Sequence, residues 1–418
     1  MMINAVKSLY ACVGLATLLA CTATTPATVI DVSPEGEMAG PRTSYYNLRV
    51  GDLRLAFTGN AVMRWTDNLG YSANNNSAWS LVPSLGVDAY YPISPYFQIS
   101  GGLTAGYEFY LSGDGEDQFF INGSEGALRG DVTAEIRFDD DSAIQISDSF
   151  AREIDTLDIA ARDRAEDYAA WVHTFSARYS KALNRRTTGK VQYTHNDRWT
   201  SDSTFNHLDY SSDSLDAVVL YRLMKNFSLG PYLRVNSTRF HEDKRNDRVI
   251  YEGGVSTTGQ LQLGGNVSYT FNFGYQSPQI SNDNDPTATD EENGLVTNFN
   301  LSVRPGVLPG HRFRAGYNRN HTDPDPGVNY SDELFLGYGI DIRLWKEFLA
   351  SADIDWRDIS DSDGGEDATL WRFTLRSTYD LTEKTALRAQ YTYTDKSSDV
   401  GANEFSQNMI EIGVSHRF

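Results

Sequence analysis

Cysteine is almost absent from this chain, which narrows the chemistry it can perform. Of its 418 residues only Cys12 and Cys21 are cysteines, and both lie in the apolar N-terminal segment. The rest of the protein therefore has no disulfide, no thiol nucleophile and no cysteine metal site.

Positive charge is also scarce. The chain has 36 lysines and arginines against 56 aspartates and glutamates, which gives a formal net charge of −20 at pH 7. Because nucleic acids and anionic lipid surfaces repel a polyanion, we expect neither as a partner.

Long hydrophobic runs are missing beyond the N-terminus. No stretch there reaches the roughly 18 consecutive apolar residues that a membrane-spanning helix needs. A strand of a membrane β-barrel needs only about ten residues of alternating character. The composition thus argues against helical membrane spans and is compatible with a membrane β-barrel.

The stretch from Phe405 to Phe418 carries such an alternation. One face holds Phe418, His416, Val414, Ile412 and Ile410, and the residues between are Arg417, Ser415, Gly413 and Glu411. A period of two that ends on an aromatic residue is typical of a transmembrane β-strand. The last strand of a soluble antiparallel sheet has the same period, so this segment alone leaves both alternatives open.

The same alternation recurs through the chain from about residue 50, for example over residues 226–239, 266–276, 334–344 and 385–396. Long and short connections alternate between these strands. The short ones are expected near residues 92–95, 139–141, 181–186, 223–225, 263–265, 305–310, 345–346 and 382–384. Short periplasmic turns and long extracellular loops produce this alternation in outer-membrane barrels. We predict an all-β fold, a transmembrane antiparallel β-barrel of about 18 strands, with 16 as the lower bound.

Aromatic residues make up 12% of the chain and gather near the ends of these strands. One set lies near short turns: Tyr90, Tyr91, Tyr96, Phe97, Phe227, Trp345, Phe348 and Tyr379. Another lies near long loops: Trp65, Phe109, Trp199, Phe240, Tyr275 and Trp356. Two such bands favour the interfacial girdles of a barrel over a soluble β-sandwich. A β-propeller is a further alternative, but strands of ten or more residues are too long for most of its blades.

The N-terminal residues have the pattern of a secretory signal peptide, because Lys7 precedes a short uncharged apolar run. Leu18-Leu19-Ala20-Cys21 resembles a bacterial lipobox, which makes Cys21 a candidate for acylation. Ordinary signal-peptidase cleavage at Ala23 or Ala27 is the alternative. We expect a signal peptide over residues 1–20, a flexible periplasmic leader over 21–49 and the barrel over 50–418.

The expected inward face of the later strands is rich in arginine. Its candidate pore-lining residues are Arg304, Arg312, Arg314, Arg343, Arg372, Arg376 and Arg388, and Arg357 shares this face. The same face also carries acidic residues, namely Asp341, Asp353, Asp355 and Glu411. Two interpretations remain open. The arginines either pair with these acids and brace the wall, or form a basic track that favours anions and acidic sugars.

The acidic residues concentrate in the expected outer loops, as in the cluster from Asp358 to Asp367. They form either a hydrated surface or sites for divalent cations that bridge to lipopolysaccharide phosphates. The spacing in this cluster does not fit an EF-hand.

Signatures of catalysis are sparse. None of the seven histidines is paired at metal-ligand spacing with another histidine or a glutamate on a helix, and no G-x-S-x-G element or phosphate loop is present. Histidines near the outer strand ends have aspartates close by: His195 with Asp197, His207 with Asp209, His241 with Asp243 and His321 with Asp323. A hydrolase at the barrel rim is therefore an alternative, but we expect no enzyme, no cofactor and no metal.

The hairpin Tyr379-Asp-Leu-Thr-Glu-Lys-Thr-Ala-Leu-Arg-Ala-Gln-Tyr-Thr-Tyr-Thr resembles the repeated hairpins of β-barrel porins found with exopolysaccharide and exosortase loci of Gram-negative bacteria. The resemblance extends in style over residues 50–418 and rests on short motifs. It implies an outer-membrane barrel tied to polysaccharide export or surface assembly. It carries over no functional residues.

We therefore expect a barrel in the bacterial outer membrane that acts as a passive or polymer-export pore for anionic solutes or exopolysaccharide. A non-conducting structural or surface-binding barrel is the alternative. The expected partners are outer-membrane lipid and lipopolysaccharide, polysaccharide-export components, and the barrel-assembly machinery through the C-terminal strand ending at Phe418.

Overall fold

The computed structural model describes the greater part of the chain from Tyr46 onward. The described residues are 46–68, 77–113, 117–121, 130–139, 141–154, 169–200, 206, 209–241, 247–262, 265–280, 294–305, 310–320, 330–361, 366–400 and 404–418. Cys21 and the expected signal peptide lie outside them. In these residues no helix is both long enough and apolar enough to span a membrane.

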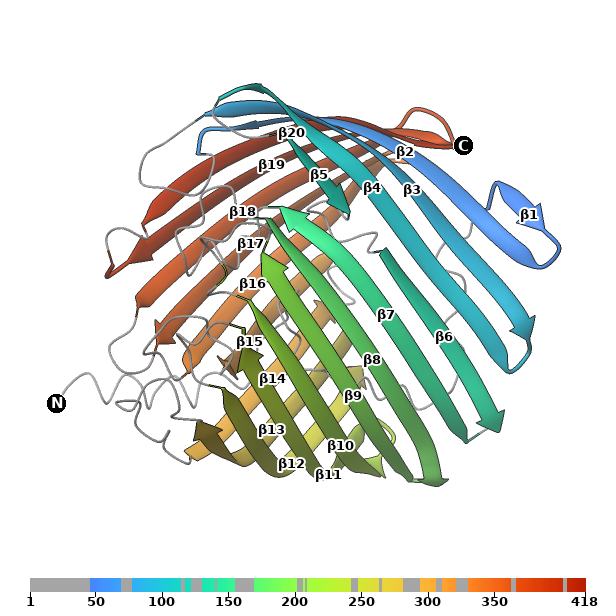
Figure 1. Ribbon diagram of the computed structural model, residues 1–418, viewed down its shortest axis with the longest axis vertical. Helices are drawn as coiled ribbons and strands as arrows, with labels where there is room; N and C mark the ends of the chain where they lie inside the picture. Colours follow the sequence, from blue (N-terminus) through green and yellow to red (C-terminus); the bar gives the residue numbers. More distant parts are fainter. Residues whose placement is uncertain are drawn as a thin grey trace.

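Strands make up nearly all of the described structure (Figure 1). They are β1 (Leu48–Val50), β2 (Leu53–Thr66), β3 (Ala78–Ser94), β4 (Phe97–Ser112), β5 (Gln118–Ile121), β6 (Gly130–Asp139), β7 (Ser142–Ile154), β8 (Ala169–Asn184), β9 (Thr187–Thr200), β10 (Tyr210–Met224), β11 (Phe227–Phe240), β12 (Arg248–Gln262), β13 (Gly265–Ile280), β14 (Gly294–Pro305), β15 (His311–Asn320), β16 (Ser331–Trp345), β17 (Phe348–Asp361), β18 (Asp367–Asp380), β19 (Thr385–Ser398) and β20 (Phe405–Arg417).

Eighteen of these strands form a closed antiparallel wall, as the sequence predicted. Consecutive strands pair along the wall, and β20 pairs with β2 over Thr58↔Arg417 to Thr66↔Met409. In Figure 1 the red β20 accordingly lies beside the blue β2. Closure leaves the wall without a free edge, so backbone donors and acceptors are satisfied between strands.

The two remaining strands, β1 and β5, supplement the wall. The short β1 folds back on β2 through the turn at Gly51, whose φ of 62° favours glycine. Both β5 and β6 pair with β4 and with β7, so they share one position in the wall. Residues 122–129, which join the two pieces, lie outside the described residues.

Side chains alternate between the lumen and the outside with the expected period of two. On β20 the side chains of Ile410, Ile412 and Val414 are exposed on the outward face, whereas Glu411 and Ser415 are buried on the inward face. An apolar outward face and a polar inward face characterise barrels that span the outer membrane.

Short turns lie at one end of the barrel and long connections at the other, which confirms the predicted alternation. Only two residues separate β8 from β9 and β10 from β11, whereas residues 155–168 separate β7 from β8. We call the two ends the turn end and the loop end. In barrels of this kind they face the periplasm and the exterior, respectively.

Aromatic side chains form contacts near both ends of the wall. Trp345 and Phe348 stack at the turn end with ring centroids 4.7 Å apart, and Trp171 and Trp199 stack near the loop end at 6.5 Å. Tyr90 was expected in a girdle, but it is buried on the inward face, where its hydroxyl donates to Gln98 Oε1 at 3.0 Å. Phe240 likewise falls on the inward face, in register with Tyr210. The expectation for these two was wrong because position near a strand end does not determine the face.

Candidate pore lumen

The inward face of the wall carries arginines that lie between carboxylates of neighbouring strands. We define three such groups, each centred on strands that are adjacent or nearly adjacent in the wall. In each group at least one acidic partner is buried beside the wall. Paired charges therefore form part of the lumen lining, beside buried apolar side chains such as Phe335 and Leu370 on the same inward face.

The first group, the β15–β18 network, surrounds Asp353 of β17. Its carboxylate lies 3.0 Å from Arg312 Nη2 and 3.5 Å from Arg314 Nη2 of β15, and 3.0 Å from Arg376 Nη1 of β18. Arg312 also pairs with Asp341, and Arg314 donates to Asp355 at 2.8 Å. Asp353 is only 8% exposed, so its charge depends on these guanidinium groups.

Glycines on β16 make this network possible. Arg312 and Arg314 must cross β16 to reach β17, and the residues opposite them are Gly339 and Gly337. A Cβ at Gly337 would lie 3.0 Å from Arg314 Nε and would overlap Asp355 Oδ1. The absence of a side chain on β16 therefore opens the path for each ion pair.

The second group joins the first and last strands of the wall. Arg64 of β2 donates from Nε to Glu411 of β20 at 2.7 Å and from Nη1 to Glu108 of β4 at 3.1 Å. Ser80 of β3 donates its hydroxyl to the same Glu108 at 2.5 Å. This group links four wall strands across the closure between β20 and β2.

The third group lies on β10, β11 and β12. Arg234 of β11 pairs with Asp216 of β10 and, at 3.4 Å, with Glu252 of β12. Tyr232 donates its hydroxyl to Glu252. All four side chains lie on the inward face, and both carboxylates are buried.

The arginines singled out from the sequence fall into two kinds. Arg312, Arg314 and Arg376 belong to the β15–β18 network, and Arg372 lies directly across from Asp355 in the pairing of β17 with β18. Arg357 lies 3.5 Å from Glu333. The pairing matches the interpretation in which arginines brace the wall.

Arg343 and Arg388 differ from the others. Both lie on the inward face close to the turn end, and both are exposed. Within the described residues neither has an ion-pair partner. The side chain of Arg304 lies outside the described residues.

Sequence reasoning missed the groups around Arg64 and Arg234. The period of two places both arginines on the inward face, which was the available signal. Their partners are far away in the chain or on another hairpin, so local patterns did not reveal the pairing.

Of the histidines considered for hydrolysis, His195 and His241 belong to the described residues, and both lie on the outward face. His195 Nε2 lies 2.9 Å from Asp197 Oδ2, and His241 Nε2 lies 2.9 Å from Ser211 Oγ. A nucleophile–base pair also needs a group that orients the base. No carboxylate among the described residues hydrogen-bonds the His241 ring. His207, His321, Asp243 and Asp323 lie outside the described residues.

Comparison with known proteins supports this architecture. Residues 225–418 match a family model described as "Outer membrane protein beta-barrel domain". No curated protein matches the chain. The match and the apolar outward face agree with the predicted location in the outer membrane, and the protein is an outer-membrane β-barrel.

The chain also aligns over most of its length with several solved structures at low sequence identity. OpdK from Pseudomonas aeruginosa is 10% identical, with 87% of this chain and 99% of that chain covered and a TM-score of 0.48. OccAB3 of Acinetobacter baumannii is 11% identical, with 88% and 100% covered and a TM-score of 0.44. OprD of Pseudomonas aeruginosa is 9% identical, with 91% and 98% covered and a TM-score of 0.44.

Proposed function

We propose that the barrel is a passive, water-filled channel for small polar solutes and that its turn-end mouth favours anions. The observation that carries the proposal is the pair of exposed inward arginines, Arg343 and Arg388, which have no ion-pair partner among the described residues. A cation without a local counter-ion attracts anions that pass within a few ångströms.

A wet lumen is supported by the wall itself. Barrels of about 16–18 strands enclose an aqueous channel, whereas barrels of about eight strands are filled by side chains. Arg376 points inward and is nevertheless 47% exposed, and Asp341 and Asp355 of the same network are also partly exposed. Water reaches these groups on the lumen side.

The paired arginines contribute less to selectivity than their number suggests. Arg312, Arg314 and Arg376 each lie within 3.5 Å of Asp353, and Asp341 and Asp355 add further negative charge. Their fields largely cancel at a distance. Anion preference in this proposal therefore arises at the turn end and not along a continuous basic track.

The resemblance of the hairpins to porins of exopolysaccharide loci extends the proposal to acidic sugars and acidic polysaccharide as solutes. Unpaired arginines suit the carboxylates of such sugars. A non-conducting barrel with an occluded lumen is the competing function, and a conductance measurement separates the two.

The test is single-channel recording of the refolded protein in a planar bilayer with a salt gradient. The unmodified protein is expected to give stable conductance steps with anion preference. The double variant R343Q/R388Q is expected to lose most of that preference and keep its conductance. R186Q is the matched control, because Arg186 lies in the turn between β8 and β9 beside the outward Tyr221.

Two results would count against the proposal. A folded barrel without conductance would point to the occluded alternative. Anion preference that is unchanged in R343Q/R388Q would remove the role given to the turn-end mouth. Block of the current by polygalacturonate from the turn-end side, absent in the double variant, would support acidic polysaccharide as a solute.

A further inference from the structure

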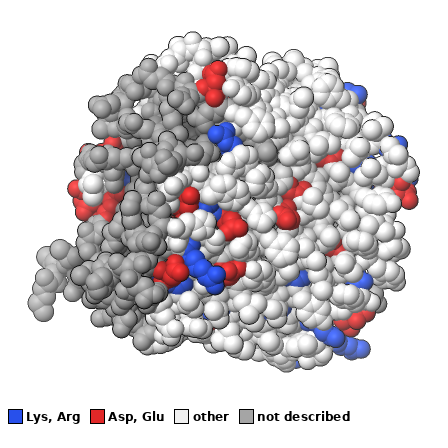
Figure 2. All heavy atoms as spheres, viewed as in Figure 1, with Lys and Arg blue, Asp and Glu red and all other residues white. Residues whose placement is uncertain are grey.

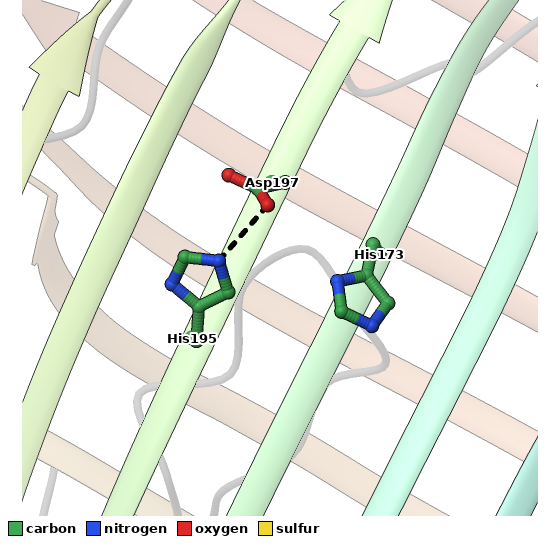
Figure 3. Close-up of side chains that lie close together, drawn as sticks. All are labelled: His173, His195 and Asp197. Atoms are coloured by element: carbon green, nitrogen blue, oxygen red, sulfur yellow. Dashed lines mark hydrogen bonds and ion pairs between the residues drawn. The ribbon is translucent and has the colours of Figure 1, made fainter.

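Ionisable side chains interrupt the outward face of the barrel near the loop end. On the neighbouring strands β8 and β9 these are His173, His195 and Asp197 (Figure 3). Figure 2 shows charged residues gathered over the loop-end half of this wall, and a mostly uncharged band between them and the turn end. A lipid-facing surface is ordinarily apolar, so a polar cluster there calls for a function.

The strand register brings the three side chains together. His173 lies directly opposite Asp197 in the pairing of β8 with β9, and His195 is two residues before Asp197 on the same strand and face. The histidine rings lie 6.3 Å apart. Each residue offers one ligand atom, and these three atoms all lie within 4.8 Å of one another. This spacing suits one metal ion bound between them.

Each imidazole is oriented by a second carboxylate. His195 Nδ1 lies 2.9 Å from Asp213 of β10, and His173 Nε2 lies 2.8 Å from Asp148 of β7. One ring nitrogen of each histidine thus faces an orienting carboxylate. The other nitrogen of His195, Nε2, lies 2.9 Å from Asp197 Oδ2 (Figure 3), so a bound ion would take the place of this hydrogen bond, and a nitrogen of His173 is turned toward the same side. Metal-bound histidines characteristically donate their other N–H to a carboxylate in this way.

The charge balance also favours a cation. Asp148, Asp197 and Asp213 bring three carboxylates to one patch of the outward face, and Arg239 of β11 faces the same way two residues along from Asp213 in the register. A divalent ion would offset the remaining negative charge. The histidines and Asp197 are each about 30% exposed, so an ion can enter from outside.

We propose that His173, His195 and Asp197 bind a divalent transition-metal ion of the zinc class on the outward face, held in orientation by Asp148 and Asp213. Two imidazoles and one carboxylate suit zinc, which takes three protein ligands and leaves a fourth position open. Magnesium and calcium prefer all-oxygen ligand sets and are expected to bind far more weakly.

The test is calorimetric titration of the full barrel, refolded in detergent and stripped with chelator, with zinc chloride and separately with magnesium and calcium chloride. We expect one zinc ion to bind, with affinity at least 100-fold above that of the other two ions. The variant H173Q/H195Q is expected to lose this site. D148N, which removes only an orienting carboxylate, is expected to weaken binding by about 10- to 100-fold.

H311Q is the matched control, since His311 is also an outward strand histidine and hydrogen-bonds Tyr338 instead of an acid. X-ray absorption of the zinc-loaded unmodified protein is expected to show two imidazoles with nitrogen about 2.0–2.1 Å from zinc. This second measurement needs no variant to fold. Equal zinc affinity in H173Q/H195Q, equal affinity for magnesium, or a spectrum without imidazole would overturn the proposal.

Discussion

Gly339 of β16 leaves the opening through which Arg312 of β15 reaches Asp353 of β17. A Cβ at this glycine would overlap Asp353 Oδ1 and lie 2.8 Å from Arg312 Nη2. The ion pair at 3.0 Å therefore depends on a residue that takes no part in it. Gly337 stands in the same relation to Arg314 and Asp355, so two successive inward positions of β16 are kept empty.

Replacing Gly339 by alanine is expected to destabilise the barrel by about 1–3 kcal/mol, because the added methyl group forces the buried carboxylate or Arg312 to move. The free energy of unfolding in urea, measured in detergent, checks this. Gly189→Ala is the control, since a Cβ there meets only Leu183 at ordinary van der Waals distance. Equal stability of the two variants would show that the opening is not required.

Replacing Asp353 by asparagine is expected to cost roughly 1–3 kcal/mol, because it removes the buried counter-charge that three arginines share, while Arg312 keeps Asp341 and Arg314 keeps Asp355. It should also raise anion preference in a planar bilayer, since positive charge in the lumen is no longer balanced. Asp358→Asn is the control, because Asp358 lies on the outward face of the same strand, where Thr369 donates to it. A loss of stability with unchanged selectivity would mean that these arginines do not face the conducting path.

The period of two was enough to predict the fold and the face of most side chains. Alternation depends only on neighbours in the sequence, as the exposed Ile412 and buried Glu411 illustrate. The ion-pair partners of the inward arginines could not be predicted from the sequence, because they depend on the register between strands. Arg64 and Glu411 are 347 residues apart in the chain, and Arg312 reaches Asp353 across an intervening strand. The sequence around Gly337 and Gly339 also gives no sign that these glycines leave room for the arginines of β15.

The cluster of His173, His195 and Asp197 shows the same limit. The sequence associated His195 only with Asp197, its neighbour on β9. It predicted the turn between the strand of His173 and that of His195 at residues 181–186. The structure places that turn at residues 185 and 186. Only the observed register sets His173 opposite Asp197, since a slip of one residue would turn it into the lumen.

We expect the stability of the barrel to depend on pH through the buried carboxyl of Asp209, which lies just before β10. Burial raises the pKa of its carboxyl above the ordinary value, although hydrogen bonds from Thr200 oppose the shift. The native state therefore binds the proton more tightly than the unfolded state. The contribution of Asp209 to stability is therefore fully present below the ordinary aspartate pKa of about 4 and is lost as pH rises through the raised native value.

Asp209→Asn is expected to remove this loss and to keep an oxygen that accepts the Thr200 N–H, now bonded at 2.7 Å. Thermal unfolding in detergent, followed from about pH 4 upward, should give curves for variant and parent that diverge with rising pH. Asp52→Asn, in the exposed turn before β2, controls for the change in net charge. Parallel curves for D209N and its parent would contradict the assignment.

The closure of the barrel offers the sharpest test of the buried ion pairs. Replacing Arg64 by methionine leaves Glu108 and Glu411 without their shared cation, and Glu108 is only 4% exposed. We expect a loss of about 3–5 kcal/mol in the free energy of unfolding. The triple variant R64M/E108Q/E411Q should regain much of this stability, because uncharged amides no longer require a counter-ion.

Arg49→Met is the control, since Arg49 and Asp52 form an exposed pair. Their atoms lie 3.3 Å apart and both side chains are more than 60% exposed, so the pair contributes about 0–1 kcal/mol to stability. If R64M and R49M lost the same stability, the group at the closure would be no more than a surface pair. If the triple variant were no better than R64M, packing of the arginine stem, and not its charge, would hold β2 against β20.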